Sequence, residues 1–130
     1  MSIKKLIGFV SIKSMKRVLT VRVESFEEGL TQFRRAWQSG RFRGEFVTFE
    51  TMADMARALT PSRFELLRTL QAQGSMMLRA LARLLKRDVK SVHRDVAPLK
   101  ELGLVENHQN DISVPYDEIR AEFTLRRKPA

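Results

Sequence analysis

The sequence predicts an α+β fold, and three observations lead to this class. Residues 18–23 and 45–51 alternate their side chains in the manner of strands. Apolar residues recur three and four positions apart through residues 61–102, as they do in amphipathic helices. After that helical region, two short apolar runs flank a tip rich in asparagine and aspartate, which is typical of a β-hairpin.

Length and charge limit what such a chain can be and what it can bind. Its 130 residues suit one domain with a modest extension, and a hydrophobic content of 43% is enough to build a core. Lysine and arginine number 24 against 15 acidic residues, which gives a formal net charge of +9. This excess favours an anionic partner, such as nucleic acid, a membrane surface or an acidic protein.

The composition also excludes several kinds of site. The chain has no cysteine, which excludes disulfides, thiolate zinc sites and cysteine nucleophiles. No stretch approaches the roughly 20 apolar residues that span a bilayer. The apolar run at residues 6–10 is followed by Lys13 and Lys16 without a small-residue cleavage site, so it does not match a signal peptide. We expect a cytoplasmic protein that does not enter a membrane.

The N-terminal part predicts a strand, a helix and a second strand. After the strand at residues 18–23, Ser25 is a good N-cap, and Glu27 lies in the first helical turn. Aromatic and leucine side chains then recur at spacings of four, three and four until the helix ends near Gly40. The strand at residues 45–51 follows. The connection between the two strands is long enough for them to run parallel.

Two helices are predicted before the central motif. Residues 52–59 make a short helix. Thr60 then serves as an N-cap and Pro61 takes the first helical position, where its missing N–H has no intrahelical partner to lose. A stripe of phenylalanine and leucine continues from there until Gly74 ends the helix.

Residues 75–103 predict a helix-turn-helix. Ser75 is expected to cap a helix that ends at Leu85, and Asp88 is expected to cap the next helix, at residues 89–102. The apolar stripe of this second helix has spacings of three, four and three. Pro98 lies inside this helix. It should kink the helix near Arg94, because proline has no backbone N–H to donate to the carbonyl oxygen one turn earlier.

The second helix and its neighbours hold the residues expected to contact DNA. A recognition helix anchors one face in the core, and the first turns of its other face reach base edges in the major groove. Arg94 is the best candidate for a bidentate contact to guanine. The predicted base-reading residues are Lys90, Ser91, His93 and Arg94. The predicted phosphate-binding residues are Ser75, Arg79, Arg87 and Lys100. Between residues 79 and 100, seven basic residues accompany two acidic ones, so this segment carries a charge of +5 toward phosphates.

A hairpin is predicted directly after that helix. Gly103 is the expected left-handed C-cap. Residues 104–106 and 112–115 then form the two sides of the hairpin. A hairpin in this place is the wing of a winged-helix domain. Its tip is polar and not basic, so we expect only weak DNA contacts from His108, Gln109 and Asn110.

The predicted fold is therefore a winged helix-turn-helix with an N-terminal strand-helix-strand extension. We expect a flexible extension at residues 1–17, in which Met15 is an alternative start. The β-α-β element covers residues 18–51, the winged helix-turn-helix covers residues 52–125, and a frayed tail covers residues 126–130.

Five segments share features with known regulators: Leu81–Arg83, Val89–Val96, Leu99–Glu106, Leu59–Leu67 and Val114–Ile119. The first three resemble bacterial and archaeal winged-helix regulators of the MarR/ArsR type. The last two resemble a narrower family of short prokaryotic regulators, and the resemblance covers roughly residues 46–125. It implies a DNA-binding protein that regulates its own gene or is paired, as an antitoxin, with a toxin.

The expected function is that of a sequence-specific regulator of transcription, a repressor or autoregulator that binds double-stranded DNA. One recognition helix covers few base pairs, so a homodimer on a near-palindrome is expected. Residues 18–51 are assigned to dimerisation, because an isolated pair of strands leaves edges to be covered. The alternative is an antitoxin that mainly binds a cognate toxin protein. Its predicted contact residues are Arg34, Arg35, Arg41 and Arg43.

No catalytic, metal or cofactor site is predicted. His93 and His108 lack acidic or thiol partners at ligand spacing. Ser91 has no base within reach by the pattern of a catalytic triad. The sequence also has no glycine-rich phosphate loop. We therefore expect a binding protein and not an enzyme.

Overall fold

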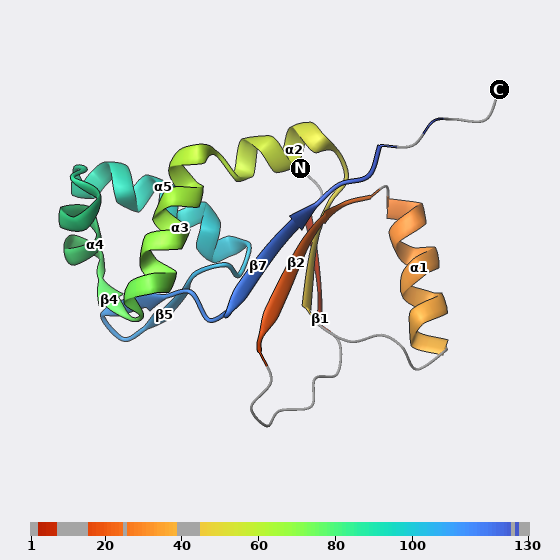
Figure 1. Cartoon of the computed structure of the whole chain (residues 1–130), viewed down its shortest axis with the longest axis horizontal. Helices are drawn as coiled ribbons and strands as arrows, with labels where there is room; N and C mark the ends of the chain where they lie inside the picture. The colour runs from red at the N-terminus through yellow and green to blue at the C-terminus, as the bar shows by residue number, and fades with distance from the viewer. Residues whose placement is uncertain (1–2, 8–15, 25, 39–44, 126, 128–130) are drawn as a thin grey trace. The chain divides into compact units, whose positions relative to one another are not determined.

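The computed structural model divides the chain into two compact units. The first unit comprises residues 1–55 and 118–130, and the second comprises residues 56–117. The residues that the structure describes are 3–7, 16–24, 26–38, 45–125 and 127. Both units combine helices with strands, which confirms the predicted α+β class (Figure 1).

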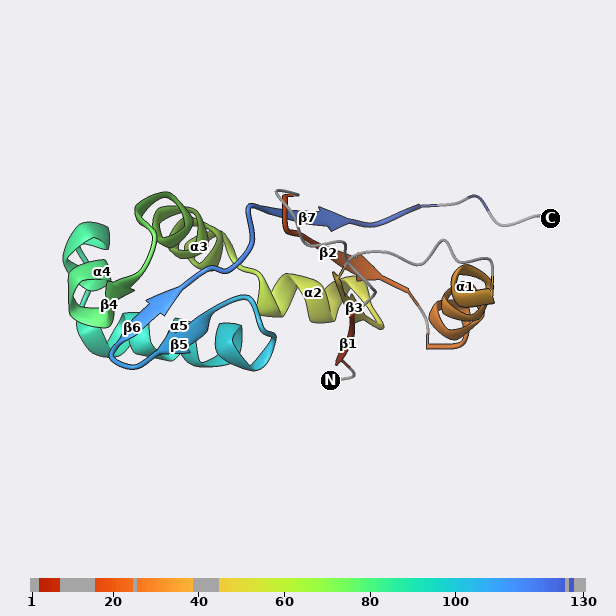
Figure 2. The same ribbon diagram turned by 90° about the horizontal axis from the view of Figure 1, so that it is seen from below.

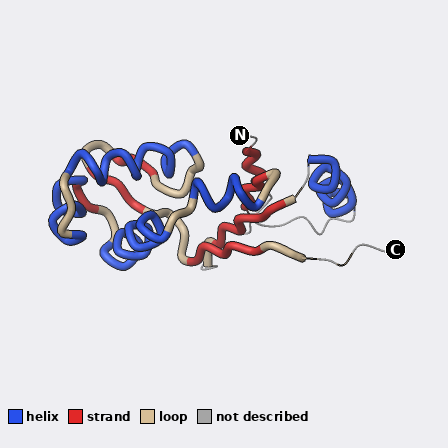
Figure 3. Tube along the Cα trace, turned by 90° about the horizontal axis from the view of Figure 1, so that it is seen from above, coloured by secondary structure: helices blue, strands red, loops and turns tan. Residues whose placement is uncertain are grey.

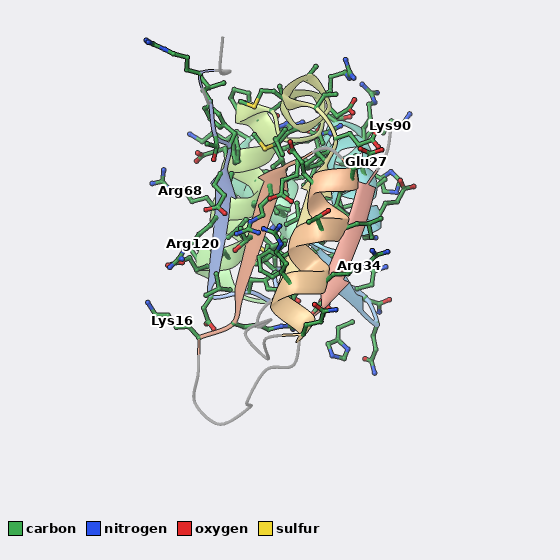
Figure 4. The ribbon with its side chains drawn as sticks, turned by 90° about the vertical axis from the view of Figure 1, so that its right-hand side faces the viewer. Lys16, Glu27, Arg34, Arg68, Lys90 and Arg120 are labelled. Carbon is green, nitrogen blue, oxygen red and sulfur yellow. The ribbon has the colours of Figure 1, made fainter. Side chains whose placement is uncertain are left out.

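A four-stranded sheet forms the first unit, with the strand order β1-β3-β2-β7. The strands are β1 (Ile3–Ile7), β2 (Val18–Val23), β3 (Glu45–Phe49) and β7 (Glu118–Glu122). β2 runs parallel to both β3 and β7, whereas β1 runs antiparallel to β3. Helix α1 (Phe26–Gln38) connects β2 to β3 and lies on one side of the sheet (Figure 4). The parallel pairing agrees with the long connection seen in the sequence.

Alternate residues of the two central strands are buried. Leu19 and Val21 of β2 and Val47 and Phe49 of β3 are fully enclosed. Glu45 begins β3 next to Leu19 in the register and is buried as well. Its carboxylate accepts two hydrogen bonds from the Arg17 guanidinium, at 2.8 and 2.9 Å. This bidentate pair compensates the buried charge.

Two strands of this sheet lie where the sequence predicted none. β1 lies within residues 1–17, which were expected to be a flexible extension. β7 belongs to the sheet of the first unit, although residues 52–125 were assigned to the winged helix-turn-helix. The predicted isolated pair of strands is therefore wrong, because β1 covers β3 and β7 covers β2. Met15 and the predicted tail, apart from Arg127, lie outside the described residues.

The second unit contains three helices and a short antiparallel sheet of order β4-β6-β5 (Figure 2). Its chain begins in the last turn of α2 (Met52–Ala58). The further elements are α3 (Pro61–Gln73), β4 (Met76–Met77), α4 (Leu78–Leu85), α5 (Val89–Glu101), β5 (Glu106–His108) and β6 (Asp111–Ser113). In Figure 3 the helices, blue, surround these short strands, red.

The core of this unit is largely made of leucine and valine. The fully buried large side chains are Leu66, Leu70, Leu81, Val92, Val96, Leu99, Leu104 and Val105. Full burial of one such side chain stabilises a fold by roughly 1.5–3 kcal/mol. Helix α4 has only 8 residues, which is too short to persist in isolation. Its helical state therefore depends on this packing.

Most of the predicted helix boundaries are confirmed. The Thr60 side chain accepts a hydrogen bond from the Arg63 N–H at 3.2 Å, ahead of Pro61. The Asp88 side chain accepts one from the Lys90 N–H at 3.1 Å. Gly103 follows α5 with φ of +79°, the left-handed conformation that glycine adopts without strain.

The predicted N-cap at Ser75 is wrong. Helix α4 begins at Leu78, and its N-cap is Met77, which makes no side-chain capping bond. Residues 76 and 77 pair instead with Ile112 and Asp111 of β6 as a short strand. Pairing with a distant strand has displaced the helix start, a tertiary effect that the local sequence does not reveal.

Candidate nucleic-acid interface

Helix α5 has two contrasting faces. Val92, Val96 and Leu99 are buried against the core. The residues on the other side are exposed: Lys90, His93, Arg94, Ala97 and Glu101. This is the division that the apolar spacing predicted, and it places basic side chains outward on the first two turns. The helix continues through Pro98 to Glu101.

Further basic residues precede α5. Arg79 and Arg83 are exposed on α4, and Lys86 is exposed in the turn, with a left-handed φ of +53°. Within the described part of the chain, these three residues, Lys90 and Arg94 take part in no ion pair. Their charges are therefore available to an anionic ligand.

A cluster around Asp95 holds α5 to its neighbours. Arg87, in the turn before α5, donates to the Asp95 carboxylate at 2.7 Å, and Arg63 of α3 donates to its other oxygen at 3.1 Å. Ser62 lies 3.2 Å from the same carboxylate. Arg63 also donates to the carbonyl oxygen of Ala58, at the end of α2, at 2.9 Å. One carboxylate thus links three parts of the second unit.

Two effects oppose each other at this carboxylate. Burial alone would raise the pKa of Asp95. The hydrogen bonds from Arg87, Arg63 and Ser62 and the charge of Arg87 outweigh burial, and they hold the pKa below the ordinary value of 3.8. The side chain of Asp95 is only 17% exposed, so solvent screens these pairs less than it screens a surface pair. The cluster is therefore a charged and ordered part of the fold at neutral pH.

This cluster gives Arg87 and Ser91 roles that the sequence did not predict. Arg87 was expected to bind phosphate, but its guanidinium is engaged by Asp95 and by the Ser91 hydroxyl, at 2.7 Å in each case. Ser91 was expected to read bases, and its hydroxyl accepts this bond from within the protein. Both side chains are half-buried. Their contacts stabilise the start of α5.

The other predicted phosphate ligands differ in how accessible they are to a phosphate. Arg79 is exposed, whereas Lys100 is half-buried near the end of α5. The Ser75 hydroxyl lies 3.5 Å from the carboxylate of Asp111 on β6. That neighbouring negative charge makes Ser75 a poorer phosphate ligand than the sequence indicated.

A hairpin follows α5 as predicted, but its strands lie closer to the tip than the expected residues 104–106 and 112–115. β5 and β6 pair antiparallel around a tip at Gln109 and Asn110, and Gln109 has a left-handed φ of +58°. His108, Gln109 and Asn110 are all exposed. His108 is aligned with Asp111 in the register. The tip therefore presents polar groups beside a carboxylate and has no lysine or arginine.

Two other kinds of site receive no support from the described residues. No three or more histidine and acidic side chains gather there in a way that could hold a metal ion. In the same part of the chain, no helix has both the length and the apolar character needed to cross a bilayer.

A family model described as HVO_A0114 matches residues 58–121, and the chain is similar to that family over this stretch. The matched residues run from the end of α2 into β7 and include all of α3, α4, α5 and the hairpin. No curated protein matches the sequence significantly.

Sequence reasoning missed the Asp95 cluster. Asp95 is one of only two acidic residues between residues 79 and 100, and its position in a basic segment was the one available signal. Arg63 is 32 positions away in the sequence. A contact at that separation depends on how α3 packs against α5, which the helical spacing alone does not give.

Proposed function

We propose that the second unit is a winged helix-turn-helix domain, and that the chain is a DNA-binding regulator of transcription. In this proposal α4 and α5 form the helix-turn-helix, α5 is the recognition helix, and the β5–β6 hairpin is the wing. The order of elements supports this reading, as does the resemblance of roughly residues 46–125 to winged-helix regulators. The protein acts by binding, in the cytoplasm, and not by catalysis.

One observation carries the proposal. The first two turns of α5 direct Lys90 and Arg94 outward without an ion pair to any described residue, while the Asp95 cluster and the buried valines hold the helix in place. A surface that reads base edges has to be held rigidly, because a hydrogen bond to a base tolerates little displacement. Solvated charges on a helix need no such support.

The contacts divide into two groups. Arg94 has the two parallel donors that match the acceptors of guanine, and Lys90 and His93 lie on the same exposed side of α5. In the expected phosphate-binding set, Arg83 and Lys86 take the place of Arg87 and join Arg79, because no described residue forms an ion pair with them. The hairpin tip contributes little affinity, since it carries no lysine or arginine.

A protein partner is the second candidate. Arg34 and Arg35 are exposed on α1, so this part of the predicted toxin-binding surface is accessible. Arg41 and Arg43 lie outside the described residues. Loss of binding to the product of an adjacent gene in Arg34→Ala/Arg35→Ala, with DNA binding unchanged, would favour this function.

Footprinting on the DNA upstream of the protein's own gene tests the first proposal, followed by titration of single-base-pair variants of the protected site. Arg94→Ala should weaken specific binding by about 1–3 kcal/mol and relax the preference at one base position. Arg68→Ala is the matched control, because Arg68 is exposed on α3 and lies on the opposite side from Lys90 in Figure 4. An equal loss on every sequence would make Arg94 a phosphate contact, and no loss would remove α5 from the interface.

A further inference from the structure

The sheet of the first unit has a free edge at β7. This strand is last in the order β1-β3-β2-β7, and among the described residues only β2 pairs with it (Figure 1). An edge strand presents backbone N–H and C=O groups that a further strand can pair with. Natural proteins usually cover, interrupt or charge such an edge, and an edge that no described residue covers can accept a partner strand.

The strand pattern continues past the last residue that pairs with β2. From Glu118 to Leu125, polar and apolar residues alternate at every position, whereas β7 itself ends at Glu122. Phe123 and Leu125 are 52% and 88% exposed. The sequence pattern therefore predicts a strand over residues 118–125 with one apolar side. Residues 123–125 of this strand extend beyond the part that pairs with β2.

Backbone directions restrict how a second strand can pair. The Glu118 N–H donates to the Arg17 carbonyl oxygen at 3.3 Å, toward β2. Because these directions alternate along a strand, Ile119, Ala121 and Phe123 direct their N–H and C=O groups to the free edge. When two identical strands pair antiparallel about a two-fold axis, the axis therefore has to pass between the two copies of one residue, and not between two peptide bonds. We call this residue the centre of the pair.

The charges select among the possible centres. A pair centred on Arg120 places two arginines opposite each other and sets Glu118 against Glu122 of the second copy. A pair centred on Glu122 places two glutamates opposite each other. Like charges in directly opposite positions are unfavourable. A pair centred on Ala121 instead sets Arg120 against Glu122 of the second copy, and this favourable pair occurs twice.

Two further centres, Phe123 and Ile119, bring no like charges together. Within the strand of residues 118–125, a centre on Phe123 pairs only residues 121–125, whereas a centre on Ala121 pairs residues 118–124. The centre on Ile119 is blocked by contacts within the chain. It would need Tyr116 and Asp117 to extend the strand. Their carbonyl oxygens already accept hydrogen bonds from the Gln71 side chain, at 3.0 and 3.1 Å, and Tyr116 is buried. The centre on Ala121 avoids these residues. It also places exposed Phe123 opposite Ile119 of the second copy, so that an apolar side chain gains an apolar neighbour.

We propose that the chain forms a homodimer in which β7 pairs antiparallel with β7 of a second copy, centred on Ala121. Glu122 already accepts a hydrogen bond from Arg22 of β2 at 2.8 Å, and in the dimer it lies between Arg22 and Arg120 of the second copy. The pair that Arg120 now makes with Glu118 is solvent-exposed, so exchanging it costs little. This interface goes beyond the proposed function and does not require DNA binding.

Single cysteines test the register, because the natural chain has none. Hydrogen-bonded partners in an antiparallel pair have Cα atoms about 5.5 Å apart, within the range of a disulfide. Under mild oxidation Ala121→Cys should form an interchain disulfide much faster than Arg120→Cys or Ile119→Cys, with Arg68→Cys as the background control. Preferential crosslinking through residue 120 or 119, or crosslinking of Ala121→Cys at the background rate, would overturn the proposal.

Sedimentation equilibrium without DNA tests the dimer itself. The natural chain should be a dimer at the crosslinking concentration, and Ala121→Pro should be a monomer with an unchanged circular dichroism spectrum. The N–H of residue 121 faces the free edge, so proline there leaves the pairing with β2 intact. A monomeric natural chain, or a dimeric Ala121→Pro variant, would contradict the proposal. Failure to bind DNA would leave these results unaffected.

Discussion

Asp95 shows how one side chain can decide the role of several others. Its carboxylate engages Arg87 and Arg63, and in doing so it removes Arg87 from the residues that could bind a phosphate. Lys86 and Lys90, close to Arg87 in the sequence, have no such partner among the described residues. Residue type and position alone could not separate these three cations. The separation depends on which of them the packing of α3 and α5 brings to Asp95.

The charged form of Asp95 should contribute measurably to stability. Asp95→Asn should lower the free energy of unfolding at pH 7 by about 1.5–3 kcal/mol, the range for hydrogen bonds to a charged group. Urea unfolding followed by circular dichroism measures this difference. Glu101→Gln is the control, since Glu101 is an exposed carboxylate on the same helix, and it should change the free energy little.

The pH dependence of this difference has a definite sign. The pKa of Asp95 is lower in the folded chain than its ordinary value of 3.8, so the folded state favours the ionised form. The stabilisation is complete above that value and is lost as the pH falls below it, toward the folded pKa. The difference between the natural chain and Asp95→Asn should therefore shrink at acid pH. A difference that stays constant down to pH 2 would argue against an ionic role.

At the level of elements, the sequence predicted those helix ends that are set by side chains within a few residues of them. Thr60, Asp88 and Gly103 mark the helix ends at which they stand, because each acts on the backbone within a few residues. The same reasoning failed at Ser75, where strand pairing with β6 moves the helix start. It also missed β1 and β7, whose partners are far away in the sequence, although residues 118–125 alternate in the manner of a strand.

The hairpin tip offers a test at this level. Gln109 holds a φ of +58° at the first position of a two-residue turn, and glycine is the residue that favours this conformation. Gln109→Gly should raise the free energy of unfolding by about 0.5–1 kcal/mol, because the left-handed strain is removed. Thermal unfolding measures the gain, and Asn110→Gly is the comparison, since residue 110 has no positive φ. A loss of stability in Gln109→Gly would contradict the turn geometry.

At the level of the whole molecule, charge alone does not locate the interface. Residues 56–117 carry ten basic and seven acidic side chains, so the second unit is less basic than the rest of the chain. In the first unit, however, the described residues Arg17, Arg22 and Arg120 are in ion pairs. Cations without an ion pair among the described residues lie in both units, with Lys16, Arg34 and Arg35 in the first. They are densest on α4, on α5 and in the turn between them, at Arg79, Arg83, Lys86, Lys90 and Arg94. The availability of the charges, and not their number, favours the second unit.

Affinity for two DNA duplexes as a function of salt concentration tests the central claim most directly. One labelled duplex comes from the region upstream of the protein's own gene, and the other has the same composition in scrambled order. The log of the binding constant should fall linearly with the log of the salt concentration, by about 0.9 for each phosphate neutralised. The upstream duplex should bind more tightly at every salt concentration. Equal affinity for both duplexes, or binding that does not weaken with salt, would contradict a basic helix that reads DNA sequence.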